Sequence, residues 1–280
     1  MKYRHACHAG NFADVAKHVA LVATLLRLAR KDRPLFLLDT HAGRGRYDLR
    51  SRDTAPEAAA GILRLASQAG PEAPATVARY LDIVRRFNEG GALQVYPGSP
   101  LIASALLRAQ DRAAFCEVQP GEAEALRSLF RGDARIGVHC RDGFEAVRAL
   151  LPPREQRGLV LIDPPYEETE AEFARVGDAL TEASTRWPQG SLAAWYPIKQ
   201  GAVAARFLRG LVDSGLRRLL VAELCVHPDD SRAGLNGSGL AFVNPPWQLD
   251  VDLREALPCL HRALSPQGAG RTRVELLAGE

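Results

Sequence analysis

The sequence predicts an α/β protein in which a mostly parallel, seven-stranded sheet is covered by helices on both faces. Short apolar runs alternate with segments of helical periodicity after residue 90, and this alternation is typical of repeated strand–helix units. An earlier apolar run ends in a glycine-rich turn and adds one more unit. The chain has 280 residues, of which 46% are hydrophobic, and this is enough for one large domain.

The elements are expected in the following order. Residues 13–30 have helical spacing with Asn11 as the N-cap, and the first strand follows at 35–38. A polar segment at 228–239 predicts a long loop between two antiparallel strands near the end of the chain. The remaining strands are expected at 115–118, 136–140, 159–162, 192–196, 219–226 and 240–243, with helices at 121–130, 144–150, 170–186 and 202–212.

Residues 51–96 break this rhythm. They are rich in Ala, Arg and Glu, show helical patterns at 58–68 and 75–88, and contain no clear strand. We therefore expect a main domain of residues 1–50 and 97–280 that is interrupted by a small inserted helical subdomain at 51–96.

Charge and cysteine usage restrict the class of protein only loosely. The net charge is +3, but residues 1–50 carry ten basic and four acidic side chains, which suits either a nucleic-acid phosphate backbone or a solvated face. Five scattered cysteines, no signal peptide and no membrane-length apolar run favour a reduced, cytoplasmic protein without a membrane partner. The N-terminal histidines lack the paired spacing of a zinc site, so we expect no metal.

Three motifs follow the first three strands of the main sheet. Asp39-Thr40-His41-Ala42-Gly43-Arg44-Gly45 joins a strand to a G-x-G turn, in which backbone N–H groups can approach an anionic ligand; a plain turn is the alternative. Glu117 ends the second strand, where an acid can accept hydrogen bonds from both ribose hydroxyls, although a surface acid fits equally. Asp142-Gly143 follows the third strand, where the acid can contact an adenine, cap a helix, or do both.

The fourth motif is Asp163-Pro164-Pro165-Tyr166, after a fully apolar strand. The two prolines fix the backbone and remove two donors, which leaves nearby carbonyls free to accept. An adenine amine is a poor nucleophile because its lone pair is delocalised into the ring. Hydrogen bonds to the Asp163 carboxylate and to a carbonyl near Pro164 would localise that lone pair, and the Tyr166 ring offers a surface for an extruded base. The motif predicts methylation of an amine on a planar base.

A second candidate motif, Asn244-Pro245-Pro246-Trp247, follows a later apolar run. It comes after the last strand pair and would lie far from the glycine turn in the order of the sheet. We therefore interpret it as the end of the last hairpin.

Together these motifs resemble the RlmJ family, the bacterial large-subunit ribosomal RNA adenine-N6 methyltransferases. The resemblance covers essentially the whole chain, and Arg44 departs from it because a small residue is usual there. It rests on the four motifs above and on Tyr3-Arg4-His5, His8-Ala9-Gly10-Asn11, Lys17-His18 and Pro97-Gly98-Ser99-Pro100.

The resemblance implies a class I, Rossmann-like methyltransferase fold that uses S-adenosyl-L-methionine. The implied substrate is one adenine of 23S rRNA, at the adenine-2030 type position, in RNA not yet assembled into subunits; the enzyme would act as a monomer. Asp163, Pro164 and Tyr166 are the expected catalytic residues, and Tyr3 and Tyr166 the expected substrate contacts. The expected cofactor contacts are His18, His41, Ser99, Glu117, Asp142, Gly143 and Asp163.

Other functions fit less well. A DNA adenine-N6 or cytosine-N4 methyltransferase is the main alternative, but residues 51–96 are few for reading a DNA groove by sequence. A nicotinamide-dependent oxidoreductase lacks its dinucleotide fingerprint, and a nucleic-acid-binding protein with a vestigial fold would not need the intact Asp163 motif.

Overall fold

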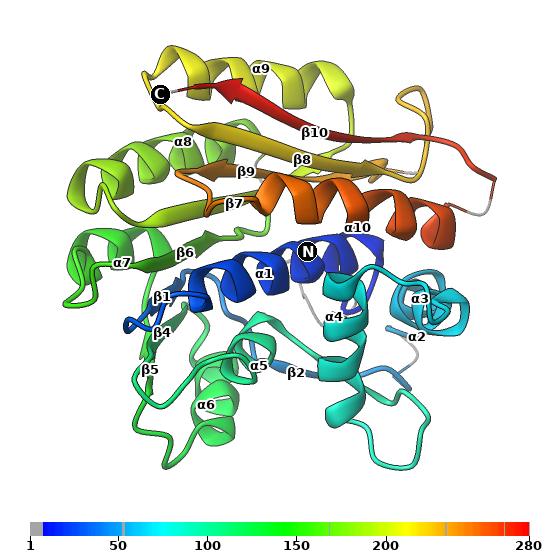
Figure 1. Ribbon diagram of the computed structural model, residues 1–280, viewed down its shortest axis with the longest axis horizontal. Coiled ribbons are helices and arrows are strands. Elements are labelled where there is room, and N and C mark those ends of the chain that lie inside the picture. The colour runs from blue at the N-terminus through cyan, green and yellow to red at the C-terminus, as the bar shows by residue number, and fades with distance from the viewer. Residues whose placement is uncertain (1–7, 52–53, 168, 233, 266, 280) are drawn as a thin grey trace.

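The computed structural model describes residues 8–51, 54–167, 169–232, 234–265 and 267–279. An eight-stranded sheet in the order β10-β8-β9-β7-β6-β1-β4-β5 forms the centre of the molecule (Figure 1). Its strands are β1 (Phe36–Asp39), β4 (Arg112–Glu117), β5 (Ile136–Cys140), β6 (Gly158–Ile162), β7 (Ser191–Ile198), β8 (Leu219–Cys225), β9 (Gly237–Val243) and β10 (Arg271–Ala278).

The register confirms the predicted fold class. β1 pairs in parallel with β4 and β6, and further parallel pairs extend the sheet to β5 on one side and β7 on the other. β9 is antiparallel to both β7 and β8. A parallel sheet with a reversed strand inserted beside its last parallel strand is the class I methyltransferase arrangement.

The predicted number of seven strands is wrong by one in the described part of the chain. β10 adds an eighth strand, antiparallel to β8, at the edge of the sheet. Its charged residues and its mostly half-buried or exposed side chains carry little of the apolar signal that marked the other strands. A separate two-stranded sheet of β2 (Arg46–Asp48) and β3 (Val95–Pro97) also escaped the prediction, because each strand has only three residues.

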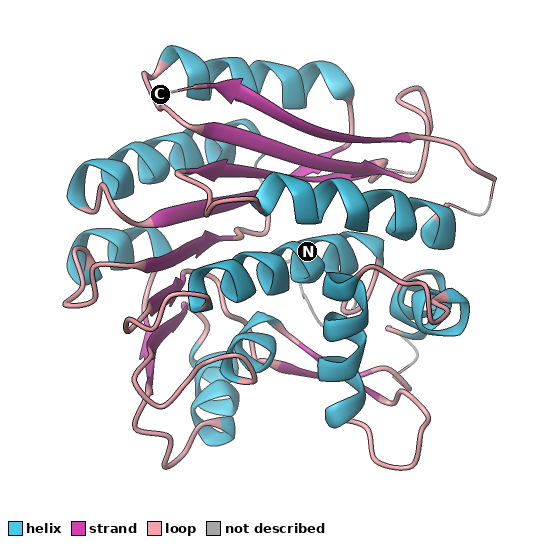
Figure 2. Ribbon diagram, in the orientation of Figure 1, coloured by secondary structure: helices cyan, strands magenta, loops and turns pink. Residues whose placement is uncertain are grey.

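Helices cover both faces of the sheet (Figure 2). On one face, α1 (Phe12–Ala29) and α10 (Leu249–Leu264) lie side by side and share a core with α6 (Pro120–Leu129). The other face packs against α7 (Gly143–Leu150), α8 (Thr169–Arg186) and α9 (Gly201–Asp213). The predicted N-cap of α1 is confirmed, since the Asn11 side chain accepts a hydrogen bond from the backbone N–H of Asp14.

The segment between β2 and β3 is helical, as predicted. It forms α2 (Ala55–Ala60), α3 (Ile62–Gln68) and α4 (Ala75–Arg86), which add buried side chains to the core under α1 and α10. The single helix expected at 58–68 is divided at Gly61, where a Cβ would lie 2.0 Å from the carbonyl oxygen of Gly10. A short helix that the sequence did not reveal, α5 (Ser99–Ser104), follows β3.

Candidate active site

Four acidic residues lie at one edge of the sheet, where β1, β4, β5 and β6 end. Asp39 and Glu117 are the last residues of β1 and β4, Asp142 follows β5, and Asp163 follows β6. Because these four strands are mutually parallel neighbours, their carboxyl ends lie at the same edge. The structure therefore brings together the four motifs that the sequence identified separately.

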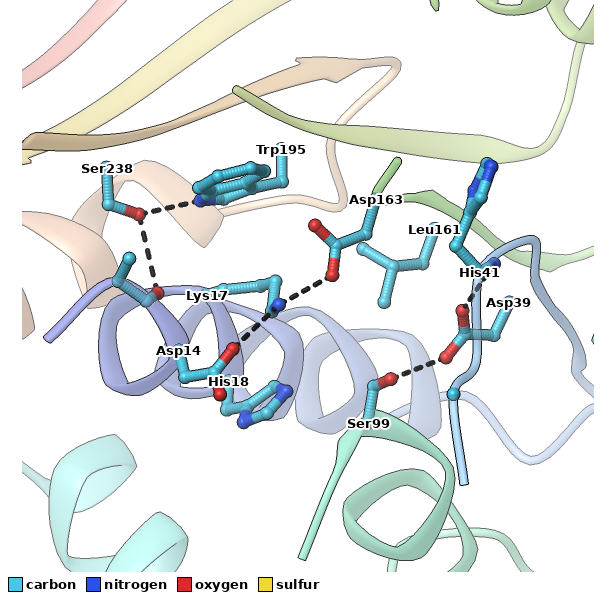
Figure 3. Close-up of polar contacts among 12 residues, drawn as sticks. Asp14, Lys17, His18, Asp39, His41, Ser99, Leu161, Asp163, Trp195 and Ser238 are labelled. Atoms are coloured by element: carbon cyan, nitrogen blue, oxygen red, sulfur yellow. Dashed lines mark hydrogen bonds and ion pairs between the residues drawn. The ribbon is translucent and has the colours of Figure 1, made fainter. Parts of the chain in front are cut away.

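Asp39 is buried and held by two neutral donors. The Ser99 hydroxyl donates to its Oδ2 at 2.6 Å and the backbone N–H of His41 donates to its Oδ1 at 3.2 Å (Figure 3). Burial, assisted by the nearby charge of Asp163, raises the pKa of Asp39 to about 6, although the two donors and the charge of Lys17 oppose the rise. This contact ties the first residue of α5 to the end of β1.

His41 lies beside Asp39 in the glycine turn. Its Nδ1 is 2.7 Å from the Thr40 hydroxyl, and its ring contacts Phe144 edge-on at a centroid distance of 5.0 Å. Burial lowers the pKa of His41 to about 4, so the ring is neutral at physiological pH. A neutral imidazole can both donate and accept hydrogen bonds.

The turn after His41 depends on glycine. Gly43 and Gly45 have φ values of +61° and +77°, a region that side chains strongly disfavour. The Gly43 N–H donates to Glu117 Oε2 at 3.0 Å, and the Gln119 N–H donates to Oε1 at 2.7 Å. Each Glu117 oxygen therefore retains capacity for one more donor. Arg44 turns outward and pairs with Glu122 at 2.8 Å.

Each side-chain oxygen of Asp142 accepts hydrogen bonds in the structure. Its Oδ1 accepts from the backbone N–H groups of Phe144 and Glu145, which confirms the predicted N-cap of α7. Its Oδ2 accepts from Arg175 of α8 at 3.1 Å. Gly143 packs so closely on β1 that a Cβ would lie 2.0 Å from the carbonyl oxygen of Thr40. This close contact requires glycine at the start of α7.

Asp163 forms an ion pair that the sequence analysis did not predict. Lys17 of α1 donates to Asp163 Oδ2 at 2.5 Å and contacts Asp14 Oδ1 at 2.9 Å (Figure 3). The side chains of Lys17 and Asp14 are about 5% exposed and that of Asp163 is 13% exposed. Burial alone would lower the pKa of Lys17, but the two carboxylates outweigh this effect and raise it, so Lys17 is a permanent cation.

The second oxygen of Asp163 has a different environment. Among the residues that the structure describes, none donates a hydrogen bond to Oδ1. Pro164 and Pro165 follow directly and contribute no N–H groups. One oxygen of Asp163 is therefore locked by Lys17, and the other can accept a hydrogen bond from a ligand.

An aromatic ring lies next to this ion pair. The Lys17 ammonium is 5.7 Å from the ring centroid of Trp195 on β7. The indole N–H of Trp195 donates to Ser238 Oγ at 2.9 Å, and the Ser238 hydroxyl donates to the Ala13 carbonyl (Figure 3). This chain connects β7, β9 and the start of α1, and it holds the partly exposed indole in place beside Asp163.

Tyr166 lies beneath this surface. It is 2% exposed, its hydroxyl donates to the Trp195 carbonyl at 2.7 Å, and its ring packs against Phe173 and Trp195. Its φ of +51° is unusual for a bulky residue and fixes the end of the motif in a tight turn. In this arrangement the ring supports the loop and presents no free face, so stacking on Tyr166 would require the loop to open.

His18 lies apart from the open part of this edge. It is 1% exposed and its Nδ1 is 2.7 Å from the hydroxyl of Tyr96, which in turn contacts the hydroxyl of Tyr80. Tyr3 lies outside the described residues. Within the ranges that the structure describes, no group of three or more potential metal ligands is present, and no helix could span a membrane.

The Asn244-Pro245-Pro246-Trp247 turn lies at the opposite edge of the sheet from Asp163. Val243 pairs with Leu192 at the start of β7, whereas Asp163 follows a strand whose last residue pairs with Ala194. The Asn244 side chain ties the turn to the Gly190 carbonyl at 3.1 Å. Trp247 is 82% exposed.

Comparisons with known proteins point to one family. The model of the family described as ribosomal RNA large subunit methyltransferase D, RlmJ, matches residues 32–278. The ribosomal RNA large subunit methyltransferases J of Haemophilus influenzae and Escherichia coli are 42% and 41% identical, each over 100% of both chains. The crystal structure of protein LPL1258 from Legionella pneumophila has a TM-score of 0.89 and 35% identity, and the match covers 96% of this chain and 98% of that one. The chain belongs to the RlmJ family of ribosomal RNA large subunit methyltransferases.

Proposed function

We propose that this protein transfers a methyl group from S-adenosyl-L-methionine to N6 of one adenine in 23S rRNA. The observation that carries the proposal is the state of Asp163, whose Oδ2 is fixed by the buried Lys17 while Oδ1 remains able to accept. If N6 of adenine donates a hydrogen bond to Oδ1, the lone pair of N6 becomes localised and points away from the carboxylate. Lys17 keeps the carboxylate in one orientation, which favours a single position of the amine.

The residues at the sheet edge fit S-adenosyl-L-methionine. Glu117 offers one further acceptor position on each oxygen, which suits the two hydroxyls of a ribose. The turn at Gly43 brings backbone close to the same carboxylate, and Asp39, Ser99 and His41 line the neighbouring strand end. When bound, the cofactor supplies an electrophilic methyl group.

The positions of the expected cofactor-binding residues suggest which of them contact the cofactor directly and which act indirectly. His41, Ser99, Glu117 and Asp142 lie around the carboxyl ends of β1, β4 and β5, and we retain them as cofactor contacts. Gly143 would act by allowing α7 to approach β1. His18, which is buried against Tyr96, would act indirectly by fixing α1 beside Lys17; a direct contact would require rearrangement.

We propose Trp195 as the surface against which the target base lies. Its indole is partly exposed, is held by Ser238, and lies beside both Lys17 and Asp163. Stacking on an aromatic ring stabilises an unpaired base by about 1–3 kcal/mol. Tyr166 supports this ring from below through its hydrogen bond to the Trp195 carbonyl. Tyr3 remains a proposed substrate contact on the basis of family resemblance.

The finer features of the substrate also rest on family resemblance. These are the adenine-2030 type position, action on RNA before subunit assembly, and action as a cytoplasmic monomer. DNA adenine-N6 or cytosine-N4 methylation remains the alternative, because Asp163-Pro164-Pro165-Tyr166 could orient any amine on a planar base.

One experiment separates these substrates. Labelled S-adenosyl-L-methionine is incubated with the protein and either undermodified 23S rRNA, assembled large subunits, or duplex DNA. We expect label at N6 of one adenine in free rRNA, little label in subunits, and none in DNA. Asp163→Asn is the control, since it retains the shape of the side chain but loses its charge and should eliminate transfer while cofactor binding persists. Labelling confined to DNA would contradict the proposal.

A further inference from the structure

Three arginines precede adjacent strands at the end of the sheet opposite the four acidic residues. Arg33 precedes β1, Arg108 precedes β4, and Arg157 precedes β6. The Arg108 guanidinium donates to the Arg33 carbonyl at 2.7 Å, and the Arg157 carbonyl accepts from the backbone N–H of Phe36 in β1 at 3.0 Å. β1 lies between β6 and β4 in the sheet, so the three arginines precede three consecutive strands.

Arg108 is fully engaged in the fold. It pairs with Asp111, whose side chain is 1% exposed, and its remaining donors reach the carbonyls of Ala29, Lys31 and Arg33 at the end of α1. Asp111 in turn accepts from the N–H of Leu35. Arg108 and Asp111 therefore form a balanced structural pair that leaves no donor of Arg108 available for a ligand.

The charges of Arg157 and Arg33 have no such carboxylate partner among the described residues. Arg157 Nη1 is buried and donates to no acceptor among the described residues. Neither Arg157 nor Arg33 forms an ion pair with a described carboxylate. The exposed Asp32 side chain lies 3.7 Å from Arg108 instead. Burial lowers the pKa of Arg157, and the charges of Arg108 and Arg33 lower it further. A buried guanidinium donor facing like charges is unfavourable unless an anion is present.

We propose that Arg157 and Arg33 form a binding site for a phosphate group at this edge of the sheet. Guanidinium groups match the oxygens of a phosphate and can contact it with paired donors. The site lies about 20 Å from Asp163, because Arg157 and Asp163 are six positions apart along the extended strand β6. An RNA that occupies both sites must therefore extend well beyond the methylated nucleotide.

The first test measures thermal unfolding of the full-length protein in sodium phosphate and in sodium chloride at equal ionic strength. We expect phosphate to raise the midpoint of the wild type by several degrees more than that of Arg157→Gln. Arg157→Lys, which retains the charge with fewer donors, should be intermediate. Arg206→Gln is the matched control, because Arg206 is an exposed arginine paired with Glu170 on the outer helices and should behave as the wild type.

The second test identifies the source of the phosphate. Binding of a 23S rRNA fragment is measured over a range of salt concentrations, and the slope of log affinity against log salt is compared. If the phosphate belongs to the RNA, Arg157→Gln should reduce the slope by about one while Arg206→Gln leaves it unchanged. If the slopes agree but the thermal effect differs, the ligand is free phosphate.

Equal phosphate stabilisation of all four proteins together with equal salt slopes would overturn the proposal, since phosphate also stabilises proteins without binding a specific site. The thermal test uses neither cofactor nor methyl transfer. Its failure would therefore leave the proposed methyltransferase function intact, and failure of methyl transfer would leave this site intact.

Discussion

Replacement of Lys17 by Met tests the central step of the proposed mechanism. Met has a similar length and apolar stem, so the change removes the ammonium group with little change in volume. It leaves two carboxylates, Asp14 and Asp163, close together in a site where the three side chains are between 4% and 13% exposed. Loss of one partner from a buried ion pair typically costs about 3–5 kcal/mol of stability.

The catalytic effect can be separated from this loss of stability. A hydrogen bond to a charged group contributes about 1.5–3 kcal/mol, which corresponds to a rate decrease of roughly 10- to 150-fold if Lys17 orients Asp163 in the transition state. The double variant Lys17→Met with Asp14→Asn removes one of the two unpaired carboxylates and should recover much of the stability. It should recover none of the rate.

The measurements are single-turnover methyl transfer and thermal unfolding of the wild type, Lys17→Met, the double variant and Lys17→Arg. We expect the defect to appear in the rate of transfer, with little change in the affinity for S-adenosyl-L-methionine. Lys17→Arg retains the charge and should keep most of the stability. If the double variant were as active as the wild type, Lys17 would have no role beyond folding, and the orientation argument would be refuted.

Three further predictions follow from the same edge of the sheet and its surroundings. Asp39 has a raised pKa, so its contribution to stability is present below pH 4 and is lost as pH rises to about 6. His41 has a lowered pKa, so its contribution is present above pH 6.5 and is lost as pH falls to about 4. In urea unfolding, Asp39→Asn should therefore gain stability relative to the wild type as pH rises, and His41→Asn should gain stability relative to the wild type as pH falls; stability curves that run parallel to the wild type would contradict both predictions. Gly143→Ala should lower the free energy of unfolding by about 1–3 kcal/mol, because the added Cβ would lie 2.0 Å from the Thr40 carbonyl oxygen. An unchanged unfolding midpoint would contradict this prediction. Trp247→Ala should leave methyl transfer within about twofold of the wild type, because the side chain is exposed at the opposite edge of the sheet; a loss comparable to that of Asp163→Asn would show that the second proline motif is functional.

The sequence predicted the parallel sheet well because apolar periodicity reports directly on burial. The N-caps Asn11 and Asp142 were also predictable, since each precedes an apolar helical pattern and its side chain needs only local donors. The eighth strand was not, because Arg271–Ala278 is held by hydrogen bonds to β8 and buries little of its own surface. Strand pairing of this kind depends on a distant partner and leaves a weak local signal.

The same distinction explains what was missed in the candidate site. Lys17 and Asp163 are separated by 146 residues, so their contact appears only in the folded chain. A local signal existed: Asp14 and Lys17 are charged residues one helical turn apart on a helix whose other residues are largely apolar, which is the pattern of a buried ion pair. The burial of Tyr166 had no such signal, because the aromatic side chains that cover it come from α8 and β7.

The four acidic residues have different charged surroundings, which supports different proposed roles for them. Burial alone would raise the pKa of Asp142, but the backbone N–H groups of α7 and the Arg175 guanidinium lower it. Asp39 and Glu117 have only neutral hydrogen-bond donors as direct partners, and burial raises the pKa of both. Asp163 alone faces a buried ammonium group on one oxygen and has no described donor on the other. We propose that Asp163 receives the neutral amine, because Lys17 holds its carboxylate in position. Glu117 and Asp39, whose direct hydrogen-bond partners are all neutral, are proposed to receive the hydroxyl groups and a cationic group of the cofactor.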